Sequence, residues 1–377
     1  MPSPPSDAIA IESSGLRADG PAQALRDYLV ERGAHVVTIE HPLERSEGGR
    51  HLVTTYAGGK RETERTLRFP LRAPASYALD PLVPLLPPRV GAWFGFNPLA
   101  AARGLAARKL RRARSVVLWS VDFTPDRFGA GNPLTRVYDR VDRFCCLHAD
   151  ARVELSDAAR AARDARHGLS GTETPTHVVP MGSWIARAPT TTPDGFESRR
   201  VVFLGNLVRG KGVELLLEAL LLLPTVGADI VGGGDLESGV RERAQILGER
   251  VRVHGFVADH REVEHILASA SLGVAPYAPA DATYTPYADP GKLKAYLAAG
   301  LPVVLTDVPP NAGELVAEAG AELVPYDAPA LAAAIEGALA SPDRWRERRN
   351  AALAYARRFD WNALFDELVA KLGVSVP

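Results

Sequence analysis

The chain has 377 residues, of which 46% are apolar and 24% are charged, and its formal net charge is -1. This length and composition are typical of a soluble globular protein with two α/β domains. The near-zero net charge excludes proteins that bind nucleic acid through charge alone. The first fifteen residues hold neither a basic segment nor a long apolar one, so we expect a cytoplasmic protein without a signal peptide. The adjacent Cys145 and Cys146 favour a reducing compartment over a disulfide framework.

Short apolar runs alternate with helix-like segments in the first half of the chain, which predicts a parallel sheet with helices between its strands. The expected strands are residues 8–12, 35–39, 90–96, 115–121 and 151–155, and residues 177–180 close this half of the chain. The expected helices are residues 22–32, 98–112, 134–146 and 157–167. Ser156 is expected to cap the last of these helices. Residues 41–75 are polar and charged with an alternating patch at His51–Tyr56, and their pattern predicts no placement.

The same alternation restarts after residues 186–199, which are rich in Thr and Pro and which we interpret as an inter-domain linker. The expected strands are residues 201–204, 229–231, 251–254, 272–276, 302–305 and 321–324. The expected helices are residues 212–222, 236–247, 261–268, 292–299, 312–319 and 328–339, followed by a helical tail with a break near Phe359-Asp360. We therefore predict an N-terminal domain over 1–185, a C-terminal domain over 200–358, and a final helix, 359–377, that packs back on the first domain.

The stretch Tyr284–Asp307, YTPYADPGKLKAYLAAGLPVVLTD, predicts a loop, a short helix and a buried strand. Asp289 is suited to cap the helix and Pro290 to occupy its first position. Lys292 and Lys294 follow in the first turn. Free backbone N–H groups and the positive end of the helix dipole attract anions. We therefore expect a nucleotide diphosphate to bind at this helix start.

A second candidate phosphate loop is Gly205–Gly212, GNLVRGKG, which follows a strand and precedes a helix. It nearly matches the P-loop pattern, but Gly212 stands where that pattern has the hydroxyl that binds magnesium. This makes a nucleotide hydrolase a poor fit. The glycines, Lys211 and Arg209 still favour phosphate binding, and the alternative is an ordinary turn with a solvated lysine.

The ordered set of motifs in the second half resembles the donor domain of GT-B glycosyltransferases, in particular glycosyltransferase family 4 and its bacterial polysaccharide-type relatives. The motifs are the Gly205–Gly212 loop, IVGGGDL, VRVHGFVADHREV and APY followed by KLKAYLAAGLPVV. The resemblance implies two Rossmann-like domains with a deep inter-domain cleft and a C-terminal helix that crosses back. It also implies transfer of a sugar from a nucleotide-diphosphate sugar, with a UDP-sugar favoured, to a glycan, lipid-linked or small-molecule acceptor. No cofactor and no metal are expected.

Carried over position by position, the resemblance implies roles in donor binding. Lys211 would hold the diphosphate with Arg209 nearby, and Gly291-Lys292-Leu293 would direct helix N–H groups at the phosphates. Phe256-Val257 would contact the base through the backbone. The expected donor-binding residues are Gly15, Asn206, Arg209, Lys211, Phe256, Val257, Tyr287, Asp289, Gly291, Lys292, Leu293 and Lys294.

The sequence departs from the family at three motif positions of the donor domain. Asn206 replaces an arginine that usually follows the loop glycine, and Tyr287 and Ala295 replace two glutamates that are eight positions apart. The second glutamate usually holds the ribose, so ribose binding must be made elsewhere. Lys292 and Lys294 are expected to compensate on the phosphate side. Family 4 implies retention of stereochemistry, but without these glutamates the outcome stays open.

Asp122 is the candidate catalytic residue of the first half, with Asp126 and Arg127 as second choices. It ends an expected parallel strand, where a carboxylate faces the crevice of such a sheet. It would act as general base or stabilise a developing positive charge. Its alternative role is a helix cap or turn residue. Gly15, in the first loop, is expected to let the backbone approach a phosphate or the acceptor.

The segment 98–114 carries six basic residues together with Leu99, Leu105 and Leu110, which predicts a basic amphipathic helix. Such a helix can lie on the inner face of an anionic membrane, or it can be a solvated helix face. Two other functions stay open: a GT-B-fold sugar-nucleotide epimerase, and a non-catalytic partner of another glycosyltransferase.

Overall fold

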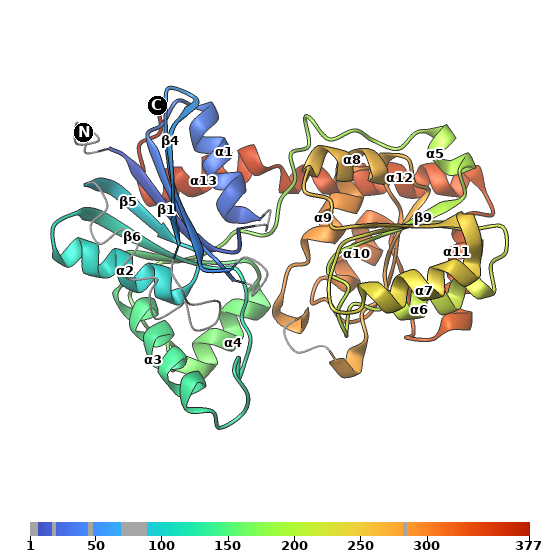
Figure 1. The fold of residues 1–377 in the computed structure, drawn as a ribbon, viewed down its shortest axis with the longest axis horizontal. Coiled ribbons are helices and arrows are strands. Elements are labelled where there is room, and N and C mark those ends of the chain that lie inside the picture. The colour runs from blue at the N-terminus through green and yellow to red at the C-terminus, as the bar shows by residue number, and fades with distance from the viewer. Residues whose placement is uncertain (1–6, 17–19, 44–47, 69–88, 282–284) are drawn as a thin grey trace. The chain divides into compact units, whose positions relative to one another are not determined.

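The computed structural model describes residues 7–16, 20–43, 48–68, 89–281 and 285–377 (Figure 1). Tyr284, the first residue of the stretch Tyr284–Asp307, lies outside the described residues, as do residues 17–19 of the first loop. The chain divides into two compact units. The first is Met1–Pro180 together with Leu364–Pro377, and the second is Met181–Ala363.

Among the described residues, the first unit holds an eight-stranded sheet in the order β4-β3-β2-β1-β5-β6-β7-β8. The predicted strands lie in the parallel part of this sheet. Strands of a parallel sheet are covered on both faces, so they appear in the sequence as short apolar runs. The strands are β1 Ile9–Ser14, β2 Val36–His41, β3 Arg50–Ala57, β4 Lys60–Arg68, β5 Val90–Gly95, β6 Ala113–Ser120, β7 Ala151–Glu154 and β8 Thr176–Val178. The unassigned residues 41–75 supply the antiparallel hairpin β3–β4.

Helices cover both faces of this sheet, with α1 and α13 on one face and α2, α3 and α4 on the other (Figure 1). Their bounds are α1 Pro21–Glu31, α2 Pro98–Lys109, α3 Pro133–His148, α4 Asp157–His167 and α13 Trp361–Leu372. The Ser156 hydroxyl accepts a hydrogen bond from the Ala159 N–H, which confirms the predicted cap of α4. Phe365 of α13 packs against Tyr28 of α1 and Trp119 of β6.

In its described residues, the second unit has a six-stranded parallel sheet in the order β11-β10-β9-β12-β13-β14. Its strands are β9 Arg200–Leu204, β10 Gly227–Val231, β11 Val251–Gly255, β12 Leu272–Ala275, β13 Val303–Thr306 and β14 Glu322–Val324. Its helices are α5 Pro193–Glu197, α6 Val213–Leu221, α7 Glu237–Leu247, α8 His260–Ala268, α9 Gly291–Ala298, α10 Ala312–Ala319, α11 Ala328–Ala338 and α12 Pro342–Ala356. The predicted alternation of strands and helices is confirmed in this unit.

Two apolar cores lie on the two faces of the second sheet. The helices α6, α7 and α11 supply one core, and α8, α9, α10 and α12 supply the other (Figure 1). A single tight turn at Arg357–Phe359 separates α12 from α13, where the break was predicted. Among the described helices, none combines the length and the apolar character needed to cross a bilayer.

Candidate functional site

The candidate site of the second unit lies where the order of its strands reverses along the chain. The central strand β9 has β10 on one side and β12 on the other, so the chain runs outward in one direction and then in the opposite direction. In parallel sheets, ligands bind beyond the carboxyl ends of the strands at such a switch point. The loop Gly205–Gly212 follows β9, and residues Pro276-Tyr277 follow β12.

Hydrogen bonds join the loops at this edge of the sheet. The Leu207 N–H donates to the Gly233 carbonyl at 2.8 Å, and the Ala278 N–H donates to the Gly210 carbonyl at 3.1 Å. The Gly232 N–H donates to the Gly255 carbonyl at 2.8 Å. Loops that follow four neighbouring strands therefore form one connected backbone surface.

Gly212 explains why the near-P-loop lacks its hydroxyl residue. The glycine has a φ of 79° and begins α6 in the left-handed conformation. A Cβ atom at this position would lie 1.7 Å from the carbonyl oxygen of Pro276, which is backbone and cannot move aside. Only glycine fits where the α6 start packs against the end of β12.

Lys292, in the first turn of α9, directs its ammonium group to the end of β9. A Cβ atom on Gly205 would lie 3.1 Å from the Lys292 Nζ atom. The residue as a whole is partly exposed, yet its Nζ atom is buried and has no hydrogen-bond partner among the described residues. Burial, followed by the positive charge of Lys211, lowers the pKa of the Lys292 ammonium well below its ordinary 10.5.

Aromatic rings line the same place. The Lys292 Nζ atom lies 4.2 Å from the ring centre of Phe203 and 4.9 Å from that of Tyr277. The Lys211 Nζ atom lies 5.3 Å from the Tyr277 ring centre. The structure therefore brings the two candidate phosphate loops together around Tyr277. Ring faces attract the ammonium groups weakly, while a phosphate would attract them far more strongly.

Tyr296 fixes the position of α9 against the sheet. Its hydroxyl accepts a hydrogen bond from the Leu204 N–H at 2.7 Å and donates one to the Val274 carbonyl at 3.2 Å. It thereby joins α9 to the ends of β9 and β12. Gly273 makes room for this ring, because a Cβ atom there would lie 2.6 Å from it. This arrangement holds Lys292 at the switch point.

Asp289 and Lys294 have structural roles that the sequence did not predict. The expected helix cap at Asp289 is wrong, since α9 starts after Pro290 without a side-chain cap. The Asp289 carboxylate instead accepts a hydrogen bond from the Met181 N–H at 2.8 Å and pairs with the Lys294 Nζ atom at 3.2 Å. Lys294 lies 3.6 Å from the ring centre of Phe359 and is 2% exposed. Its ammonium group is thus turned away from the phosphate side and paired inside the protein.

Replacing Asp289 with alanine is expected to destabilise the protein by about 3–5 kcal/mol, because the Lys294 charge would stay buried without its partner. Urea unfolding followed by circular dichroism measures this loss. The double variant D289N/K294M removes both charges and is expected to recover most of the lost stability. A double variant as unstable as D289A would show that the ion pair is not the cause.

The other expected donor-binding residues differ in how far they are exposed. Asn206 and Arg209 are exposed on the loop after β9, and Phe256 is exposed after β11. Val257 packs against the core beside α9, and the Leu293 side chain is fully buried there. The Leu293 N–H donates to the Pro290 carbonyl at 3.0 Å, so it is already used within the chain. Tyr287 and Gly291 are partly buried on the loop before α9 and at its start.

The first unit places its two candidate residues at the carboxyl ends of β1 and β6. Asp122 is exposed after β6, as expected for a carboxylate at the end of a parallel strand. Gly15 has a φ of 102°, and its N–H donates to the His41 carbonyl at 2.8 Å. This N–H is therefore used by the backbone. Asp126, a second choice for catalysis, pairs with Arg166 at 2.9 Å.

The segment 98–114 does not form one solvated basic helix face. The helix α2 ends at Lys109, and Arg114 lies in β6. Arg103 bonds the buried carboxylate of Glu12, and Arg108 pairs with Asp150. At least two of the expected surface arginines are thus engaged within the protein.

Sequence reasoning missed Phe203, Tyr277 and Tyr296, which surround or position Lys292. An aromatic residue near a strand end or inside a helix carries no sequence signal of its own, because core residues have the same pattern. Their role depends on which lysine the fold brings beside them.

Comparison with known proteins finds a family resemblance in the second unit. Residues 198–341 match the family model for glycosyl transferases group 1. Sucrose-phosphate synthase from Thermosynechococcus elongatus has a TM-score of 0.72 at 19% identity, over 97% of this chain and 99% of that one. Anabaena HepE in complex with UDP and glucose has a TM-score of 0.67 at 18% identity, over 98% of this chain and 100% of that one.

A trehalose-6-phosphate protein from E. coli bound with UDP-2-fluoro glucose has a TM-score of 0.67 at 15% identity, over 98% of this chain and 100% of that one. No curated protein sequence matches the chain. At these identities the structural likeness establishes the fold. Residues 198–341 therefore resemble the group 1 glycosyl transferases, in a chain that has the GT-B fold of two Rossmann-like domains.

Proposed function

We propose that this protein is a glycosyltransferase that binds the diphosphate of a UDP-sugar at the switch point of its second unit and transfers the sugar to an acceptor hydroxyl. The observation that carries the proposal is the buried Lys292 ammonium group, which has no hydrogen-bond partner among the described residues. A buried cation without a partner is costly, and an anion that arrives beside it removes that cost. The diphosphate of a nucleotide sugar is such an anion.

The chemistry follows from the charges that the two loops bring together. Breaking the bond between the sugar and the diphosphate leaves negative charge on the leaving group. Lys292, Lys211 and the N-terminus of α9 would stabilise that charge without reorganisation, because the fold already holds them in place. Arg209 is exposed at the mouth of the loop and would attract the donor.

UDP is favoured as the nucleotide because structural neighbours of this chain were solved with UDP and UDP-glucose. The exposed Phe256, after β11, is available to the base through its backbone and ring. Tyr287 and Ala295 occupy the positions of the family's glutamates, so the ribose would be held by other groups. We propose that the acceptor, a glycan, a lipid-linked sugar or a small molecule, binds to the first unit.

Replacing Lys211 with alanine is expected to weaken UDP binding by about 10- to 150-fold, since a hydrogen bond to a charged group contributes about 1.5–3 kcal/mol. Isothermal titration calorimetry with UDP measures the change. Lys109→Ala, in the first unit, is the matched control and should bind UDP like the wild type. Unchanged binding by Lys211→Ala would contradict the proposed role of this lysine.

Replacing Asp122 with asparagine is expected to lower kcat about a hundredfold while leaving UDP affinity unchanged, because we propose a role in proton transfer or charge stabilisation rather than in donor binding. A coupled assay of UDP release, with the donor and acceptor found by screening, gives both quantities. Asp126→Asn is the comparison variant, since that carboxylate is held by Arg166. Wild-type turnover by Asp122→Asn would exclude Asp122 as the catalytic group.

The same screen separates the other two candidate functions. The comparisons give no support to a sugar-nucleotide epimerase, which would convert a UDP-sugar without an acceptor and without releasing UDP. A non-catalytic partner protein would show no turnover. Failure to bind UDP, GDP or TDP in calorimetry would contradict the donor site itself.

A further inference from the structure

The outer face of α3, in the first unit, combines exposed apolar side chains with arginines. The exposed fractions are 61% for Leu134, 54% for Val137 and 49% for Phe144. Val137 and Phe144 are seven residues apart and share one side of the helix. Arg136, Arg140 and Arg143 follow the spacing of a second row beside them. We call these six residues the α3 face.

The arginines of the α3 face are available to an outside ligand. Arg136 and Arg140 are exposed and form no ion pair with a described residue. The Nε atom of Arg143 donates to the His167 carbonyl at 3.0 Å, which holds the guanidinium group in place. The three arginines lie beside an apolar row. Together the two rows complement a surface whose outer layer is anionic and whose interior is apolar.

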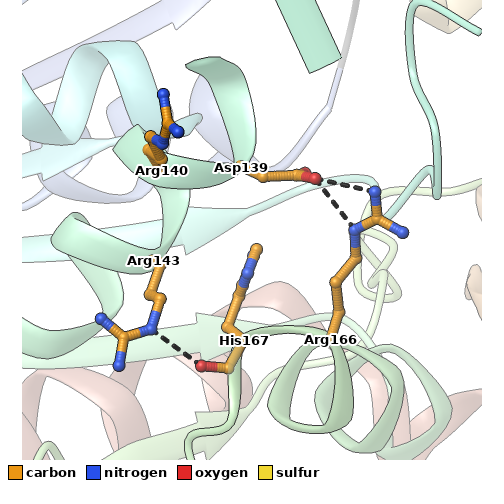
Figure 2. A pocket seen from close by; sticks show the side chains of 5 residues that line it. All are labelled: Asp139, Arg140, Arg143, Arg166 and His167. Atoms are coloured by element: carbon orange, nitrogen blue, oxygen red, sulfur yellow. Dashed lines mark hydrogen bonds and ion pairs between the residues drawn. The ribbon is translucent and has the colours of Figure 1, made fainter. Parts of the chain in front are cut away.

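An open pocket of about 510 Å³ adjoins this row (Figure 2). Arg140, Arg143, Arg166 and His167 line it, and Asp139 is the acidic residue of the lining. Asp139 is already engaged, since Arg166 donates to it from Nε at 3.1 Å and from Nη2 at 2.7 Å (Figure 2). Arg166 also pairs with Asp126, so the positive excess of the lining comes from Arg140 and Arg143, and it suits the phosphate of a lipid headgroup.

We propose that the α3 face docks on an anionic membrane, with Leu134, Val137 and Phe144 inserted among the acyl chains and the arginines at the headgroup phosphates. Helices that lie in the bilayer surface have this combination of an apolar row and a basic flank. Arginine side chains can keep their charge at the headgroups while their stems lie along apolar surface. Membrane contact is thus assigned to α3 and not to the segment 98–114, whose Arg103 and Arg108 pair with carboxylates of the protein.

Vesicle co-sedimentation tests the proposal on the full chain. The wild type is expected to bind vesicles that contain phosphatidylglycerol, to bind less as salt is raised, and to ignore vesicles of phosphatidylcholine alone. The double variant Arg136→Ala/Arg140→Ala is expected to lower the partition coefficient about 25-fold, at about fivefold for each basic residue. Val137→Ser/Phe144→Ser is expected to lower it at least about tenfold through lost apolar burial.

The matched control is Arg243→Ala/Ile246→Ser on α7 of the second unit, where Ile246 is 77% exposed. It makes one arginine-to-alanine and one apolar-to-serine change on another exposed helix, and it should bind vesicles like the wild type. Circular dichroism and UDP calorimetry check that each variant is folded, since none of these residues belongs to the donor site. Membrane docking is independent of that site, so a protein that binds UDP but no vesicle would overturn this inference alone.

Three further outcomes would also overturn it. The first is equal loss of vesicle binding in the α7 control, which would show nonspecific adhesion. The second is a dimer in light scattering that Val137→Ser/Phe144→Ser dissociates while no vesicle is bound, which would make the α3 face a protein interface. Binding of free glycerol phosphate without binding of vesicles would likewise exclude the membrane as the partner.

Discussion

Replacing Lys292 with methionine is expected to lower sugar transfer about a thousandfold and, at the same time, to make the ligand-free protein more stable. Methionine fills a similar volume but needs no hydrogen-bond partner, so the cost of burying the ammonium group disappears. Replacing buried charges by apolar groups of similar size is neutral or stabilising by about 1–4 kcal/mol. Turnover falls because one preorganised cation at the leaving diphosphate is lost, an effect of about 10²–10³ in rate.

The two effects are measured separately, by kcat/KM with the donor found by screening and by thermal melting without ligand. Lys60→Met, on the exposed strand β4, is the matched control and should change neither quantity. A Lys292→Met variant that melts at a lower temperature than the wild type would show that the ammonium group stabilises the free fold. That result would contradict the reasoning from its missing hydrogen-bond partner.

The lowered pKa of Lys292 gives this prediction a pH dependence. The folded state binds the proton of this ammonium more weakly than the unfolded state, whose pKa is the ordinary 10.5. Between the lowered pKa and 10.5, the unfolded state therefore binds more protons, and the contribution of Lys292 to stability rises with pH. Below this window Lys292 is protonated in both the folded and the unfolded state, and its buried charge destabilises the fold in full. The wild type should gain stability across the window relative to Lys292→Met.

Donor binding should raise the pKa of Lys292 again. A diphosphate beside Lys292 favours the charged ammonium, so we expect proton uptake when UDP binds at a pH inside the window. Calorimetry in buffers of different ionisation enthalpy measures the number of protons taken up. The Lys292→Met variant should take up fewer protons than the wild type, and equal uptake by both would assign the proton to another group.

Replacing Gly212 with serine, which completes the P-loop pattern, is expected to destabilise the protein by more than about 3 kcal/mol rather than to create a magnesium site. The added Cβ atom would lie 1.7 Å from the Pro276 carbonyl oxygen, and the residue would need a φ of 79°. A left-handed conformation costs an L-residue about 1–2 kcal/mol, and overpacking costs about 1–3 kcal/mol more. Thermal melting and soluble yield measure the loss.

Gly239→Ser is the matched control, because Gly239 lies in α7 and an added Cβ atom there meets nothing within 4 Å. This variant should be as stable as the wild type or more stable by a few tenths of a kcal/mol, since serine has the better helix propensity. Wild-type stability in Gly212→Ser would show that the loop can move away from β12. It would also reopen the magnesium-dependent hydrolase that the sequence pattern disfavours.

The periodicity of apolar residues, and the glycines and prolines that end helices and strands, predicted the parallel sheets and most of their helices. Strand runs such as Val201–Leu204 are buried on both faces, so their apolar character is continuous and easy to detect. The hairpin β3–β4 escaped prediction because every described side chain of β4 is exposed, and polar residues leave no alternation to detect. The cap at Asp289 was predicted wrongly because its residue type fits a cap, whereas the fold offered its carboxylate a buried lysine.

What the sequence determined by itself was the fold class and the position of two loops that carry glycines and lysines, because such residues between a strand and a helix are local features. The tertiary structure decided which lysine faces the site. Lys292 and Lys294 are two residues apart on one helix, so they point in different directions. The first reaches the switch point between β9 and β12, while the second pairs with Asp289 inside the protein. Helix geometry separates these side chains, and only the packing of α9 through Tyr296 determines which of them lies where a diphosphate would bind.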